Sequence, residues 1–287
     1  MDAECVLCHL DKNIALARSL GDEETAAAFA KELLRLHLEA PENASSPYLG
    51  PGTTALLQQY YGLDPDRYHE EKVESNRFVM ERYDQICRRV EQAADPVLAA
   101  LQFSILGNYL DFSALRGNVS FEKLEEMLSS ALEMELDMDC YAQLQKDLAN
   151  GKQFLLLTDN AGEIGFDRIL AEQVHKAYPQ LEITFCVRGQ IAQNDATRED
   201  AAVVGIDFPI IDNGNAVAGT ELSLLSKEAM DALKNADVVI AKGMGNTETM
   251  FGCGYNVYYA FLVKCGRFVR FFQKPLMTPM LVRDRKE

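Results

Sequence analysis

Acid and amide side chains follow two apolar runs in the second half of the chain. The run FLLL at 154–157 is followed by TDNAGE, so Asp159 and Asn160 come directly after it. A second run, 183–187, leads into a loop that carries Asp195, 36 residues after Asp159. If the runs are neighbouring parallel strands, these oxygens share one sheet edge and suit Mg²⁺ or Mn²⁺. Taken singly, each is also typical of a turn or a helix cap.

Two later apolar runs end in lysine, at 238–241 and 258–263. A glycine-rich turn with an ammonium group can cradle a phosphate, although this one is neither a P-loop nor a GxGxxG motif. A solvent-facing lysine that ends a strand is the alternative. A cation site beside an oxyanion site is what metal-assisted hydrolysis of a phosphate ester requires. The predicted phosphate-binding residues are Lys242, Gly243, Gly245, Asn246 and Lys264.

The elements that position these residues divide the chain into two parts. From 8 to 148 the apolar spacing is helical, with Asp22 and Ser120 as candidate caps and a loop expected over 41–54. From residue 150, short apolar runs alternate with helical segments, which predicts βαβ units and a parallel sheet. We therefore expect a helical domain over 1–149 and an α/β domain over 150–287.

Composition limits the possible partners. The chain has 287 residues, 48% hydrophobic and 25% charged, and a net charge of −16 that repels polyphosphate backbones and anionic membranes. Its apolar runs are far shorter than the roughly 20 residues that span a bilayer, and its acidic first residues do not resemble a signal peptide. These features predict a cytoplasmic protein that binds neither nucleic acid nor membrane. They leave the oligomeric state open.

The cysteines do not predict a disulfide framework, because their number is odd, at seven, and they are spread over a long chain. The motif Cys5-x-x-Cys8-His9 could be half of a zinc site or a haem attachment sequence. Zinc needs about four ligands, and no second CxxC or paired histidine follows. Haem attachment requires export, which nothing in the sequence indicates. A packing role is favoured for the two cysteines.

Several motifs together resemble the DUF89 family of metal-dependent damage-control phosphatases, in its short prokaryotic-type branch. These are, in chain order, CVLC at 5–8, DPDRYHEEKVESN, LGNYLDF, LLLTDNAGEIGFDRIL, VRGQIAQNDATREDA, AKGMGNTETM and FLVKCG. The resemblance covers nearly the whole chain. It implies a three-layer α/β/α domain with a mostly parallel sheet, preceded by an all-helical domain, with the site between them.

The resemblance also implies roles for individual residues. Asp159, Asn160 and Asp195 match the catalytic metal ligands, and the family is associated with Mn²⁺, Co²⁺, Ni²⁺ or Mg²⁺. Lys264 matches a phosphate-binding lysine, and Asn108 a contribution of the helical domain to the pocket. The residues Lys242, Gly243, Gly245 and Asn246 match the loop near the substrate. The implied substrates are small phosphorylated metabolites, such as sugar phosphates or damaged cofactor precursors.

We expect a metal-activated water to attack the phosphate, with Asp195 or a nearby carboxylate orienting it. The sequence has no DxDx[TV] motif, so an aspartyl-phosphate intermediate lacks its usual signature. Two alternatives use the same pocket: a small-molecule methyltransferase, whose acid would contact a ribose, and a non-catalytic metabolite-binding protein. A requirement for a divalent metal separates hydrolysis from methyl transfer, and tight binding without turnover would indicate the binding protein.

Overall fold

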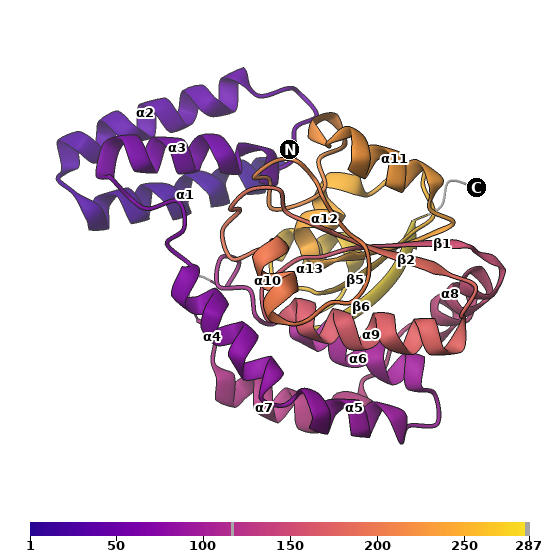
Figure 1. Ribbon diagram of the computed structural model, residues 1–287. Coiled ribbons are helices and arrows are strands. Elements are labelled where there is room, and N and C mark those ends of the chain that lie inside the picture. The colour runs from indigo at the N-terminus through magenta and orange to yellow at the C-terminus, as the bar shows by residue number, and fades with distance from the viewer. Residues whose placement is uncertain (116–117, 285–287) are drawn as a thin grey trace.

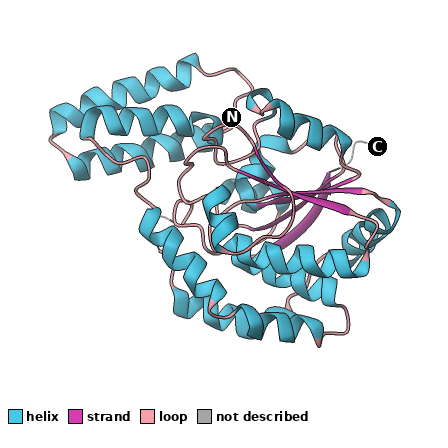
Figure 2. Cartoon of the chain, in the orientation of Figure 1, coloured by secondary structure: helices cyan, strands magenta, loops and turns pink. Residues whose placement is uncertain are grey.

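The computed structural model describes residues 1–115 and 118–284 and contains a six-stranded sheet in the order β3-β2-β1-β4-β5-β6 (Figures 1 and 2). The first five strands are parallel, whereas β6 pairs antiparallel with β5 at the edge and was not predicted. The strands are β1 (Gln153–Leu157), β2 (Glu182–Val187), β3 (Ile210–Asp212), β4 (Val238–Lys242), β5 (Val257–Leu262) and β6 (Pro279–Asp284).

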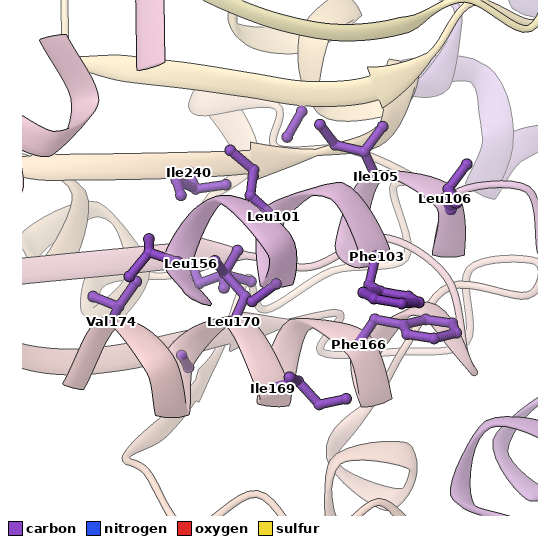
Figure 3. Close-up of a cluster of buried hydrophobic side chains, with 14 of the residues drawn as sticks. Leu101, Phe103, Ile105, Leu106, Leu156, Phe166, Ile169, Leu170, Val174 and Ile240 are labelled. Atoms are coloured by element: carbon purple, nitrogen blue, oxygen red, sulfur yellow. The ribbon is translucent and has the colours of Figure 1, made fainter. Parts of the chain in front are cut away.

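Each face of the sheet is covered by helices, which confirms the predicted α/β/α arrangement. Alternate side chains of β1 and β4, such as Leu156 and Ile240, pack with α6 (Pro96–Gly107) and α9 (Glu163–Ala177) (Figure 3). The intervening side chains pack with α11 (Lys227–Asn235), α12 (Gly243–Met250) and α13 (Gly266–Phe272). Because the strands are buried on both faces, they appear in the sequence as continuous apolar runs.

The core on the α6 face extends across the predicted boundary at residue 150. Ten of the twelve residues of α6 are buried, since this helix lies between the sheet and an outer group of helices. That group shares the core through side chains such as Val90, Leu128 and Leu144. Its helices are α4 (His69–Met80), α5 (Tyr83–Glu91), α7 (Phe121–Ser129) and α8 (Met138–Asn150); the short α10 (Arg198–Val203) lies beside α4 and α9.

The first three helices have a core of their own, built around Phe29, Leu33 and Leu57. They are α1 (Ala3–Leu20), α2 (Glu23–Glu39) and α3 (Gly50–Tyr61), which project beyond the strand ends in Figure 1. As predicted, Asp22 caps α2 by accepting a hydrogen bond from Thr25 N at 2.7 Å, and Ser120 caps α7 in the same way. The loop predicted over 41–54 is wrong in part, because α3 already begins at Gly50. Pro51 lies in the first turn of α3, where the backbone N–H has no partner within the helix.

Across residues 1–115 and 118–284, no helix combines the length and the hydropathy required to cross a bilayer.

Candidate active site

A cavity of about 310 Å³ lies at the carboxyl ends of the parallel strands, the edge at which ligands bind in open α/β sheets. The strand ends are in register there, since Leu157 of β1 lies opposite both Cys186 of β2 and Ala241 of β4. Helices α1 and α3 form the opposite wall. The lining includes Asp159, Asn160, Asp195, Gly245 and Lys264 from the sheet side, and His9, Lys12 and Thr53 from the helices.

The three predicted oxygen ligands lie together on this wall. Asn160 and Asp195 pair as an isolated β-bridge, and Asn160 Nδ2 donates to Asp159 Oδ2 at 2.8 Å. The backbone closes the group, because Ala196 N donates to the Asp159 carbonyl at 2.7 Å. Each of the three side chains belongs to a residue no more than 5% exposed. The loop between β2 and α10 thus folds back onto the end of β1.

The electrostatics of this group favour a bound cation. Burial, followed by the charges of Asp195 and Glu163, raises the pKa of Asp159 well above its ordinary value. Burial also raises the pKa of Asp195 to about 6, against the lowering effect of Arg188. Buried carboxylates that repel one another hold their charge more easily when a positive ion lies between them.

Arg188 is a member of the site that we did not identify from the sequence. It is 1% exposed, and its Nε donates to Asp195 Oδ2 at 2.6 Å. Its Nη2 lies 3.6 Å from Asp159 Oδ1, so one guanidinium faces both carboxylates. The available signal was an arginine that directly follows an apolar strand. Its position partly compensates the negative charge and fixes the direction of Asp195.

The donor set fits a hard divalent cation. Two carboxylates and the Asn160 amide are oxygen ligands of the kind that Mg²⁺ and Mn²⁺ prefer. Next to them, Asn194 Oδ1 is a buried acceptor without a hydrogen-bond partner among the described residues. Across 1–115 and 118–284, no group of three or more His, Cys, Asp or Glu residues is placed to hold a metal. A cation here would therefore depend on the asparagine as well as the two acids.

Lys242, predicted as a phosphate-binding residue, is not among the residues that line the cavity. It is fully buried, and its Nζ donates to Glu163 Oε1 at 2.7 Å, Asp167 Oδ1 at 2.8 Å and the Ser104 carbonyl at 2.9 Å. An ammonium has three donors, and all three are used within the protein. Lys242 therefore neutralises carboxylates between the sheet and α6 and α9, and it presents no donor to a phosphate in the cavity.

The glycine-rich start of α12, directly after β4, is built for close packing. Gly243 has φ +76°, and a Cβ there would lie 1.9 Å from Asp159 Oδ2. A Cβ on Gly245 would lie 2.2 Å from the Ala218 carbonyl oxygen. Asn246 is fully buried and donates to the Lys242 carbonyl at 2.6 Å. Of these three residues at the start of α12, Gly245 lines the cavity, whereas Gly243 and Asn246 support the residues around it.

Lys264 is one of the residues that line the cavity, although its side chain is fully buried, whereas Asn108 lies outside the lining. Lys264 Nζ donates to Asp111 Oδ2 at 2.8 Å, and both residues line the cavity. Asn108 is fully buried: its Nδ2 donates to Asp159 Oδ2 at 3.0 Å, and its Oδ1 accepts from Leu262 N at 3.1 Å. The predicted contribution of Asn108 to the pocket is thus indirect, through the orientation of Asp159.

Helix α1 contributes a face that the motifs did not assign. Cys5, Cys8, His9 and Lys12 recur at helical spacing and all line the cavity. The His9 ring bonds to His37 Nε2 at 3.0 Å and to Thr53 Oγ1 at 3.1 Å. Burial, with His37 and Lys12 nearby, lowers the pKa of His9 to about 4, so the imidazole is neutral at pH 7. The wall opposite the acids is therefore polar and carries one ammonium.

The fold and this cavity define an α/β protein with a candidate ligand site at the carboxyl edge of its sheet. The damage-control phosphatase ARMT1-like domain matches residues 1–278. A damage-control phosphatase of Pyrococcus horikoshii is 30% identical over 86% of this chain and 84% of its own. A damage-control phosphatase of Archaeoglobus fulgidus is 32% identical over 80% of this chain and 79% of its own. The crystal structure of a DUF89 family protein from P. horikoshii superposes with a TM-score of 0.83 at 26% identity, covering 99% of both chains.

The chain belongs to the family of damage-control phosphatases with an ARMT1-like domain. The family resemblance stated from the motifs is therefore confirmed, and so is the fold that it implied. The names of the relatives agree with the predicted phosphatase enzyme. The metal, the substrate and the roles of individual residues remain predictions.

Proposed function

We propose that this protein is a metal-dependent phosphomonoester hydrolase of small phosphorylated metabolites, such as sugar phosphates or damaged cofactor precursors. The observation that carries the proposal is the meeting of Asp159, Asn160 and Asp195 with Lys264 in one cavity. An acidic end that favours a cation and an ammonium that favours an oxyanion are both needed to bind and activate a phosphate monoester.

Each side chain then has a distinct task. Asp159, Asn160 and Asp195 would hold a divalent cation, which supplies Lewis-acid activation of the phosphoryl group and of the attacking water. Lys264 binds phosphoryl oxygens and stabilises their charge, while Asp111 holds its ammonium in place. Arg188 holds Asp195 in a fixed direction. The burial of these groups strengthens their electrostatic interactions.

The size and polarity of the cavity support a small substrate. A volume of about 310 Å³ lies near the lower end of the range for ligand sites, roughly 300 to 1,000 Å³. The wall formed by α1 and α3 includes Lys12 and Thr53, polar side chains that suit a small polar ligand. Lys264 favours phosphate over the methyltransferase alternative, in which the ligand would not need this cation.

The test is hydrolysis of para-nitrophenyl phosphate, and then of a panel of sugar phosphates, by chelator-treated protein. Mn²⁺, Co²⁺, Ni²⁺ and Mg²⁺ are added back singly. We expect turnover that depends on the metal and that falls at least 100-fold in Asp159→Asn. The matched control is Asp139→Asn, an exposed carboxylate of α8 outside the cavity lining, which should retain wild-type turnover.

Two results would contradict the proposal in different ways. Absence of turnover on every ester with every metal would exclude the hydrolase and favour a binding protein. Wild-type turnover and metal affinity in Asp159→Asn would leave a phosphatase but refute this set of ligands.

A further inference from the structure

A charged cluster lies directly beneath the cavity, between the sheet and helices α6 and α9. Glu163, Asp167 and Lys242 are each fully buried, and the ammonium contacts both carboxylates. Burying three charged groups is costly unless each has a fixed partner. Glu163, at the first position of α9, connects this cluster to the wall of the cavity.

Both carboxylate oxygens of Glu163 accept hydrogen bonds from the N–H groups around them. Lys242 Nζ lies 2.7 Å from Oε1, and Asn160 Nδ2 lies 2.7 Å from Oε2. Asn108 Nδ2 donates at 3.0 and 3.2 Å, and the backbone N–H of Asn160 donates at 3.3 Å. An ionised carboxylate accepts all of these bonds, whereas an amide of the same size would turn a donor toward at least one of them.

These contacts determine which end of the Asn160 amide faces which neighbour. Its Nδ2 lies between Asp159 Oδ2, at 2.8 Å, and Glu163. Its Oδ1 accepts from Asn194 Nδ2 at 2.8 Å, and that nitrogen also donates to the Leu110 carbonyl at 2.9 Å. In the reverse orientation, the Asn160 oxygen would face the carboxylates of Asp159 and Glu163, and its NH₂ group would face the NH₂ group of Asn194.

Asp159 is oriented by the same network. Its Oδ2 accepts from Asn160 Nδ2 and from Asn108 Nδ2, and both of these amides are bonded to Glu163. Its other oxygen, Oδ1, faces Arg188. One carboxylate at the start of α9 thus holds both donors that fix Asp159 Oδ2.

We propose that Glu163 is a positioning residue that sets the geometry of the cation site through Asn160 and Asn108. By holding the NH₂ groups of both amides, it fixes the directions of Asn160 Oδ1 and of the Asp159 carboxylate. The inference rests on the proposed function, since it assumes that Asp159 and Asn160 bind a metal. Groups that orient metal ligands in this way typically change affinity by about 10- to 100-fold when they are removed.

The test is Mn²⁺ binding by isothermal titration calorimetry, without substrate, on wild type and Glu163→Gln. We expect the Kd for Mn²⁺ to rise about 10- to 100-fold, while KM for the phosphate ester at saturating Mn²⁺ stays within about twofold because Lys264 is unchanged. Thermal unfolding followed by circular dichroism establishes that the variant is folded at the assay temperature. The matched control is Glu172→Gln on the same helix, whose carboxylate pairs with Arg168 at the surface.

A second variant examines the other amide that Glu163 holds. Asn108→Ala removes a donor shared by Glu163 and Asp159 Oδ2 without touching Lys242, and it too should weaken Mn²⁺ binding. If Glu163→Gln does not fold, this variant decides the question. Wild-type protein that binds Mn²⁺ while the folded variants bind it within threefold of wild type would overturn the positioning role alone. Folded wild-type protein that binds no divalent metal would overturn the proposed function, and this inference with it.

Discussion

Replacing Lys242 with methionine tests whether this lysine stabilises the fold or binds phosphate. The side chain is fully buried, and its loss leaves Glu163 and Asp167 without their cation. Removing one partner of a buried ion pair costs about 3–5 kcal/mol. Methionine fills a similar unbranched volume, so a cavity adds little to that cost. Against a typical total stability of roughly 5–15 kcal/mol, Lys242→Met should be folded but strongly destabilised.

The loss of stability in Lys242→Met should also depend on pH, because Asp167 can take up a proton. Burial raises the pKa of Asp167 to about 6, although Lys242 lowers it, so removal of the lysine raises the pKa further. An acid whose pKa is higher in the folded than in the unfolded state binds more protons when folded, and stability then falls as pH rises above about 4. Lys242→Met should therefore be more destabilised at pH 8 than at pH 5.

The assay is urea unfolding followed by far-ultraviolet circular dichroism at both pH values. The control is Lys176→Met, an exposed lysine paired with Glu91, for which we expect at most about 1 kcal/mol. Lys264→Met serves as the functional comparison and should raise KM for the phosphate ester. The reasoning is refuted if Lys242→Met unfolds within about 1 kcal/mol of the Lys176 variant. A stable Lys242→Met protein that had lost phosphate affinity would restore the original prediction from the sequence.

Two further predictions concern Gly243, at the start of α12, and Asp237, just before β4. Gly243→Ala should lose most metal-dependent turnover, because the added Cβ would displace Asp159. It should also destabilise the fold by about 1 kcal/mol or more in urea unfolding, because φ at this position is positive. Wild-type kinetics of the variant would contradict this. Backbone N–H groups of Lys152 and Gln153 lower the pKa of Asp237, so the stability it contributes is present above pH 4 and is lost as pH falls through its folded-state pKa. Unfolding curves of wild type and Asp237→Asn should accordingly differ at pH 7 and converge near pH 2, whereas a constant difference would exclude this origin.

Local patterns in the sequence were sufficient for the elements and for the acidic half of the site. Buried parallel strands give short apolar runs, and a polar group that follows such a run lies at the carboxyl edge of the sheet. This reasoning placed Asp159, Asn160 and Asp195 at one edge, where the structure brings them together. The Asp22 cap was equally predictable, because it depends on neighbours within one turn.

Local patterns were insufficient wherever the direction of a side chain depended on packing. Lys242 follows Val238 and Ile240 at alternate positions of β4, so it shares their face of the sheet. That face is covered by α6 and α9, which bring Glu163 and Asp167 to its ammonium. The alternation is visible in the sequence, but the helices that cover each face are not. For the same reason, the role of Arg188 could not be inferred from its position alone.

The sequence by itself determined that this chain contains a parallel sheet, acids and amides at its carboxyl edge, and the motifs of its family. These properties depend on residue type and on spacing within a strand or a turn. Only the tertiary structure decided that Lys242 pairs with buried carboxylates behind the site, that Lys264 pairs with Asp111, and that α1 brings Lys12 to the cavity. The physical reason is that the contacts of these lysines join residues 75 to 153 positions apart, and such contacts are set by how layers pack rather than by local chain conformation.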